Sequence, residues 1–158
     1  MTPDRLRDLV RRHLDEGYRS EPGTLLYSGL DTLRPGDFYL MGLNPGGKPK
    51  EAPTPIIDTL SDRAGWSAYT MDCWNDGCGK PCACEHLDAD GRLKPEFMRP
   101  HQKLVAALIE LLGLAPERIF STNAVFLRSE GANSPPGPDR SWQRCWRRCW
   151  NVHREFLG

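Results

Sequence analysis

The stretch FYLMGLNPGG, residues Phe38 to Gly47, joins a short apolar run to a glycine-rich turn. The apolar run, from Phe38 to Met41, follows the turn-forming residues 35–37 and ends at a glycine. A run of this length with turn signals at both ends is typical of a buried strand in a parallel sheet. We therefore predict an α/β fold, with a short parallel sheet between flanking helices and this strand at its centre.

The turn that follows has the composition of a ligand-binding loop. Gly42, Gly46 and Gly47 allow the backbone to turn sharply and to approach a ligand closely. Pro45 fixes its own φ and restricts Asn44 to extended conformations. Ligand sites in open α/β sheets lie just beyond the carboxyl ends of such strands. Because Asn, Pro and Gly are also ordinary turn residues, a simple tight turn is the alternative interpretation.

Length and composition indicate one globular domain, spanning residues 1–158. The formal net charge is zero, so there is no global basic field to attract a nucleic acid, although a local basic face could serve. No apolar run is long enough to span a membrane, and no signal core follows the N-terminus. We expect a cytoplasmic monomer with no membrane partner, in which the six cysteines are thiols or metal ligands.

The remaining elements are predicted from hydrophobic spacing. Residues 3–14 form an amphipathic helix, capped by Thr2 or Asp4 and stopped at Gly17. Residues 25–27 form a short edge strand. A second helix spans residues 101–114 with a wide apolar face, and residues 119–127 form the next strand, which completes a right-handed parallel unit. The apolar residues of that helix face are Leu104, Val105, Leu108, Ile109, Leu111 and Leu112.

The last helix is predicted over residues 141–157. One face carries apolar or aromatic residues at helical spacing, and we expect it to face the core rather than to stack on a ligand. Its members are Trp142, Cys145, Trp146, Cys149, Trp150, His153 and Phe156. The arginines on its other faces are expected in solvent, with phosphate contact as the alternative.

A Cys-rich insertion occupies about residues 66–92, where periodicity is weak. Four thiols and an imidazole within fourteen residues could form a tetrahedral zinc site, because a small polar insertion has little core of its own. The candidate ligands are Cys73, Cys78, Cys82, Cys84 and His86. The alternative is a set of unbound thiols, since the spacing is not the paired one of common zinc modules. Trp66, Tyr69 and Trp74 could stack on a base, or could cover the core, which we favour.

Two segments resemble the uracil-DNA glycosylase superfamily. Gly42-Leu43-Asn44-Pro45-Gly46 resembles its first active-site motif, in the Gly-x-Asn-Pro-Gly version. The segment from Thr122 to Val125 resembles the strand that carries the base-reading asparagine, here Asn123. The two motifs follow in family order. An amide has both a donor and an acceptor, so it can pair with the imide edge of uracil, whereas cytosine presents the reverse pattern.

The resemblance implies a three-layer sandwich that hydrolyses the N-glycosidic bond of uracil or another deaminated base in DNA, after that base is flipped out of the stack. It implies that Asn44 orients the attacking water and that Asn123 reads the base. Gly42, Leu43, Pro45 and Gly46 would complete the binding site. Some members carry an iron–sulfur cluster, but its cysteine pattern is not matched here, so we expect none.

The resemblance covers about the N-terminal two-thirds of the family domain. The family continues with two more strands and a motif containing a catalytic histidine, neither of which follows in these 158 residues. We therefore expect a fragment or a shortened relative that is weak or inactive alone. The competing hypothesis is a non-catalytic, metal-stapled module that binds nucleic acid or protein. The loop 129–139 could pinch a phosphate backbone, or could be an ordinary connection.

Overall fold

The computed structural model describes residues 1–34, 38–43, 45, 53–60, 63–74, 84–129, 134–136 and 141–158. The helices are α1 (Pro3–His13), α2 (Glu16–Arg19), α3 (Ala68–Met71), α4 (Pro100–Leu111) and α5 (Trp142–Leu157). The strands are β1 (Phe38–Gly42) and β2 (Ile119–Asn123). Short 3-10 helices are η1 (Leu30–Thr32), η2 (Ile56–Thr59), η3 (Cys84–His86), η4 (Pro95–Phe97) and η5 (Pro116–Arg118). Every helix in the described part of the chain is too short or too polar for a membrane span.

The sheet has two parallel strands, as predicted, in a register that runs from Phe38 opposite Ile119 to Gly42 opposite Asn123. The segment 23–28 lies antiparallel along the other edge of β2, joined to it by isolated bridges. Its Tyr27 N–H donates to the Ser121 carbonyl at 2.9 Å. This segment is the predicted edge strand, but it pairs too irregularly to form a regular strand.

The prediction that β1 is the buried, central strand is wrong. Among the described residues β1 pairs only with β2. Phe38 is exposed and the other four β1 residues are half-buried, whereas all five residues of β2 are buried. The physical reason is position, since within the described part of the chain β2 has a neighbour on each edge and β1 has one.

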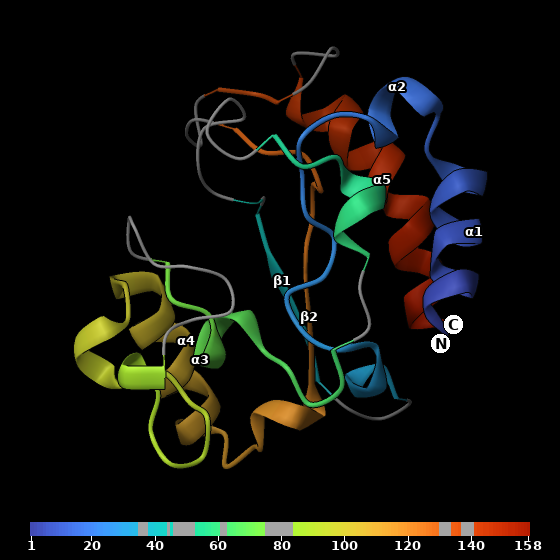
Figure 1. Cartoon of the computed structure of the whole chain (residues 1–158). Coiled ribbons are helices and arrows are strands. Elements are labelled where there is room, and N and C mark those ends of the chain that lie inside the picture. Colours follow the sequence, from blue (N-terminus) through green and yellow to red (C-terminus); the bar gives the residue numbers. More distant parts are fainter. Residues whose placement is uncertain are drawn as a thin grey trace.

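Helices cover both faces of the sheet (Figure 1). Helices α1 and α5 lie on one face, and α3 and α4 lie on the other. Side chains alternate along β1, so Tyr39 packs into the core beneath α1 and α5, while Leu40 packs against the α4 layer. The chain is therefore a mixed helix-and-strand fold, in agreement with the predicted class at that level.

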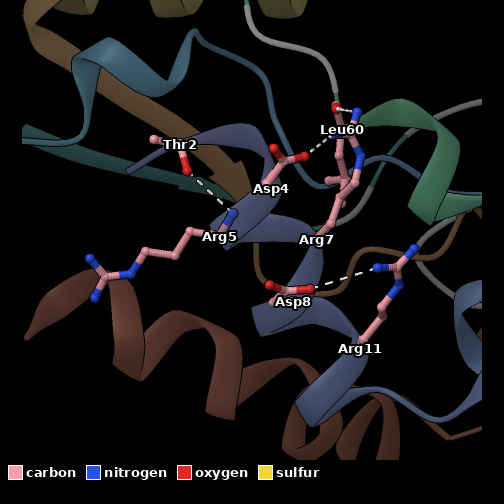
Figure 2. A network of polar contacts seen from close by, with 7 residues as sticks. All are labelled: Thr2, Asp4, Arg5, Arg7, Asp8, Arg11 and Leu60. Atoms are coloured by element: carbon pink, nitrogen blue, oxygen red, sulfur yellow. Dashed lines mark hydrogen bonds and ion pairs between the residues drawn. The ribbon is translucent and has the colours of Figure 1, made fainter.

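Helix α1 is confirmed over Pro3–His13, with Thr2 as its cap. The Thr2 hydroxyl accepts from the Arg5 N–H at 3.3 Å, and Arg7 pairs with Asp4 at 3.0 Å (Figure 2). Arg7 also donates to the Leu60 carbonyl at 3.2 Å, which ties the helix to the end of η2. The prediction that Gly17 stops this helix is wrong. The helix ends at His13 with Leu14 as its C-cap, and Gly17 lies inside α2.

Helix α5 supplies much of the larger core, as predicted. Cys145, Cys149, His153 and Phe156 are buried, while Trp150 remains 38% exposed. Burial raises the pKa of the Cys149 thiol to about 12, so this thiol is protonated at neutral pH.

Helix α4 differs most from the prediction. Only Val105 and Ile109 of its predicted apolar face are buried. They pack with Leu40 and Ile119 in a small second core. The other four leucines are exposed, because a sheet of two strands is too narrow to cover the whole face. They are Leu104, Leu108, Leu111 and Leu112.

Candidate functional site

The two motif segments meet at the carboxyl ends of β1 and β2. Gly42 lies opposite Asn123 in the strand register. Beyond that pair the backbones stay joined, because Ala124 N–H donates to the Gly42 carbonyl at 2.7 Å and Val125 N–H to the Leu43 carbonyl at 2.9 Å. Parallel strands place their carboxyl ends at one edge of a sheet, so the sequence spacing and the register agree.

Asn123 is the buried polar group of this edge. Its side chain is 2% exposed, and its Nδ2 has no hydrogen-bond partner among the described residues. A buried amide donor without a partner is costly, by about 1–3 kcal/mol. Such a group is retained where a ligand or an ordered water supplies the acceptor. The Nδ2 group of the amide, which lies near the Tyr27 hydroxyl, is therefore available for recognition.

Gly42 makes room for this amide. A Cβ placed on Gly42 would lie 2.8 Å from the Asn123 Oδ1 and 3.4 Å from the Tyr69 hydroxyl oxygen. The first distance is too short for any side chain. The first glycine of the motif is thus required by the packing of Asn123, whatever else the turn does.

Tyr27 and Tyr69 form the wall beside Asn123. Their ring centroids are 5.6 Å apart. Burial raises the pKa of Tyr27, and nearby Arg128 and the Asn123 amide partly oppose that rise. Burial also raises the pKa of Tyr69 to about 12. Both hydroxyls are therefore neutral at physiological pH and can donate or accept a hydrogen bond.

The wall continues into an aromatic cluster. Trp74 meets the Tyr27 ring edge-on at 6.1 Å and stacks against His101 at 6.3 Å between centroids. Tyr69 is 2% exposed, so its predicted core role is confirmed and a stacking role on its face is not favoured. Trp66 lies elsewhere, held by a hydrogen bond from its Nε1 to Asp72 at 2.9 Å, with Arg63 over its ring.

Behind the site, His153 joins the strands to α5. Its Nε2 lies 3.2 Å from the Ala124 carbonyl, and its Nδ1 lies 2.7 Å from the Tyr39 hydroxyl. Because a carbonyl can only accept, Nε2 carries the proton and Nδ1 accepts from Tyr39. Burial lowers the pKa of His153, in keeping with this neutral form. The core role predicted for His153 is confirmed.

The turn that follows β1 contains the remaining predicted site residues, and the structure describes only some of them. Asn44 and Gly46 lie outside the described residues, so their place beside Asn123 stays a prediction. Pro45 is buried and Leu43 is 55% exposed. Two surface hollows of about 290 and 430 Å³ are lined by neither Gly42 nor Asn123. Neither hollow is therefore part of the edge at which Gly42 and Asn123 meet.

The predicted zinc ligands are only partly described. Cys73 is buried, and His86 stacks on Phe97 with centroids 4.2 Å apart. Cys78 and Cys82 lie outside the described residues, and only the backbone of Cys84 is described. Within the described ranges, no three His, Cys, Asp or Glu side chains gather closely enough to hold a metal ion. The zinc site stays a prediction.

The sequence interpretation missed Tyr27 as a neighbour of Asn123, and Arg128 as a charged neighbour of Tyr27. Tyr27 was placed only as part of an edge strand. The antiparallel bridge between Leu26 and Thr122 is what brings it to the site. Alternation within the Leu25–Tyr27 run does not reveal a partner strand nearly a hundred residues away.

No family model matches the chain, and no curated protein or solved structure matches it.

Proposed function

We propose that this chain is a uracil-DNA glycosylase-like domain, whose function is to recognise a deaminated base in DNA and to hydrolyse its N-glycosidic bond. One observation carries the proposal. The glycine of the Gly-x-Asn-Pro-Gly motif and the asparagine of the Thr-Asn-Ala-Val strand lie opposite each other, and the asparagine is a buried amide with an unpartnered donor. Helices on both faces of the sheet are compatible with an incomplete three-layer sandwich of that family.

The proposed recognition step uses the amide of Asn123. Uracil offers a carbonyl acceptor and an imide N–H donor on adjacent positions, which an amide can pair with at once through Nδ2–H and Oδ1. Cytosine offers an amino donor and a ring acceptor in the reverse order. Burial fixes the amide and lowers the local dielectric, so a mismatched base would leave polar groups unpaired at a high cost. The base must leave the duplex stack or come from a single strand.

The proposed bond cleavage needs little acid–base chemistry from the described residues. The glycosidic bond lengthens with oxocarbenium character while the base departs as an anion. Stabilising that anion and placing a water are the two requirements. Asn44 would orient the water through its side-chain carbonyl, and backbone N–H groups at Gly46 and Gly47 would face the base or a phosphate. These three roles rest on the sequence motif alone.

The test compares oligonucleotides that carry one uracil or one cytosine at the same position. We expect this chain to bind single-stranded uracil DNA about 10- to 100-fold more tightly than cytosine DNA, which is the discrimination that one good bidentate base contact provides. Asn123→Ala should abolish this difference in affinity. Ser121→Ala is the matched control, because Ser121 is also buried on the same face of β2 but lies two residues from the strand end.

Cleavage in the same samples separates the two functional hypotheses. Release of uracil that is lost in Asn44→Ala supports the glycosylase. Uracil-selective binding without cleavage supports the non-catalytic binding module. Equal affinity for the uracil and cytosine strands, unchanged by Asn123→Ala, contradicts the proposed base reading.

We also propose that Cys73, Cys78, Cys82 and Cys84, or His86 in place of one thiol, hold a structural zinc ion. The support is their density within fourteen residues of a polar insertion. Elemental analysis of protein purified without chelator is the test. Less than about a tenth of an equivalent of metal contradicts it, because structural zinc binds too tightly to be lost.

A further inference from the structure

His153 is a fully buried imidazole to which the proposed chemistry gives no role. Aromatic rings surround it, with centroids 5.0 Å away for Phe126, 5.6 Å for Trp146 and 6.4 Å for Phe156. An apolar side chain could fill the same volume without removing polar nitrogen atoms from water. The hydrogen bonds of a polar group in such surroundings are therefore the place to look for its role.

Both ring nitrogens of His153 are hydrogen-bonded. Nδ1 accepts from the Tyr39 hydroxyl at 2.7 Å, and the Nε2–H donates to the Ala124 carbonyl at 3.2 Å. Burial lowers the pKa of His153, and hydrogen bonding to the backbones of Ala124 and Asn123 partly opposes that decrease. The imidazole therefore lies against the backbone of the base-reading residue and of the residue that follows it.

Ala124 is the first residue after β2, at the point where the chain bends. Both of its backbone polar groups have partners. Its N–H donates to the Gly42 carbonyl of β1 at 2.7 Å, and its carbonyl accepts from His153 of α5. A residue at a bend has no complete strand ladder around it, so these two bonds fix the backbone that directly follows Asn123.

His153 lies on the opposite face of the sheet from the Asn123 amide. Phe120 packs against Phe156 on the α5 face, with centroids 5.1 Å apart. Because side chains alternate along β2, Asn123 faces the other way, toward Tyr27. His153 therefore acts on the amide only through the backbone, by setting the direction in which the side chain leaves the strand.

We propose that His153 is a positioning residue for base reading, which holds the bend at Ala124 and so fixes the Asn123 amide in the orientation that pairs with uracil. The inference rests on the proposed uracil recognition. An imidazole suits this place because one neutral ring supplies a donor for the Ala124 carbonyl and an acceptor for the Tyr39 hydroxyl. Two bonds to the base must form at once, so a shift of the amide by about 1 Å would remove much of the discrimination.

The experiment measures the ratio of affinities of the full chain for uracil and cytosine single strands. His153→Leu should lower that ratio by about 10-fold or more, because the Ala124 carbonyl loses its donor. His153→Gln should keep the ratio within about three-fold of the wild type, because an amide supplies both a donor and an acceptor. A partly unfolded variant binds both strands more weakly by the same factor, so loss of folding cancels from the ratio.

Two further variants separate positioning from packing. Val152→Ala is the matched control, since Val152 is fully buried beside His153 on α5, and it should lower stability but leave the ratio unchanged. Tyr39→Phe keeps both rings and removes only the bond to Nδ1. Its ratio should lie between those of the wild type and His153→Leu, and it decides the question if His153→Leu does not fold.

Hydrogen exchange gives a readout that needs no DNA. In His153→Leu the amides of Ala124 and Val125 should exchange at least about 10-fold faster relative to that of Ser121, which donates to the Ser28 hydroxyl away from the bend. His153→Gln should restore their protection, and Val152→Ala should not change it.

The outcomes distinguish this proposal from the proposed function. A wild type that prefers uracil, with an equal preference in His153→Leu, overturns the positioning role. So does a loss of preference in Val152→Ala as large as that in His153→Leu. A wild type with no uracil preference contradicts base reading by Asn123, and exchange then decides whether His153 holds the bend. Unchanged exchange at Ala124 and Val125 in His153→Leu overturns that role as well.

Discussion

Strands β1 and β2 have the same length and pair residue for residue, yet the more apolar strand is the less buried one. Strand β1 reads FYLMG and is the more apolar, while β2 reads IFSTN and carries three polar residues. All of β2 is buried, and none of β1 is. Position in the sheet decides burial here, because β2 is paired on both edges. The polar residues of β2 are tolerated because neighbours can satisfy them, as the Thr122 hydroxyl does by donating to the Leu25 carbonyl at 2.7 Å.

The largest expected effect tests this comparison directly. Phe120→Ala in β2 should lower the free energy of unfolding by about 3–5 kcal/mol, because a fully buried ring leaves a cavity. Phe38→Ala in β1 should lower it by less than about 1 kcal/mol, because that ring is 49% exposed. Urea unfolding of dilute protein measures both. Equal losses would mean that β1 is as buried in solution as β2.

The second effect lies where the two strands meet. Gly42→Ala should destabilise by about 1–3 kcal/mol, because the new methyl group would collide with the Asn123 Oδ1. Gly17→Ala is the control. It lies in helix α2 with its nearest contact at 3.5 Å, so it should be neutral or slightly stabilising.

A double variant sharpens the Gly42 result. Asn123→Ala removes the atom with which the Gly42→Ala methyl collides, so the combined variant should lose less stability than the two single losses added together. Simple additivity would show that the cost of Gly42→Ala arises in the turn rather than against Asn123.

The third effect is confined to acid and concerns the link from β1 to β2 through His153. Burial lowers the pKa of this histidine in the folded protein, so between that lowered value and about 6.5 the unfolded chain binds more protons. Stability should therefore fall as pH drops below about 6.5 and should be fully present above it. His153→Gln keeps groups that can bond Tyr39 and Ala124 but does not titrate. Its stability should depend less on pH, and an unchanged slope would exclude His153 as the cause.

The smallest effect is expected at the exposed start of α1, away from both strands. Thr2→Ala should cost about 0.5–1 kcal/mol, because one N-terminal N–H loses its side-chain acceptor. Thermal unfolding would detect it. Asp8→Asn is a useful comparison, since its pair with Arg11 at 3.7 Å is exposed and should contribute almost nothing. A larger loss in Asp8→Asn than in Thr2→Ala would contradict this ranking.

Local patterns predicted the elements with strong periodicity. Helices α1 and α5 have their predicted cores, and the order strand, helix, strand correctly predicted parallel pairing. Helix α4 was predicted correctly as a helix but not in its burial. Its leucines follow helical spacing whether or not a neighbour exists to cover them, and only the width of the sheet decides that.

The candidate site, like the fold, was predicted only in part. The meeting of Gly42 with Asn123 follows from strand order and parallel register, which the sequence indicates. The tyrosine wall does not follow, because Tyr27 reaches Asn123 through irregular bridges on the far edge of β2. Pairings of that kind depend on contacts distant in sequence and leave no periodic signal.

The burial of Cys149 makes the reactivity of its thiol a measure of core opening. Its thiol lies 3.9 Å from the Tyr18 hydroxyl oxygen, between α5 and α2, and is fully shielded from solvent. A protonated, inaccessible thiol does not react with alkylating reagents, whereas the same group in an open chain does. Labelling of Cys149 therefore requires α5 to separate from its neighbours, and the labelling rate measures how often this separation occurs. A native cysteine thus reports the opening of the longest helix in the described structure, with no added label.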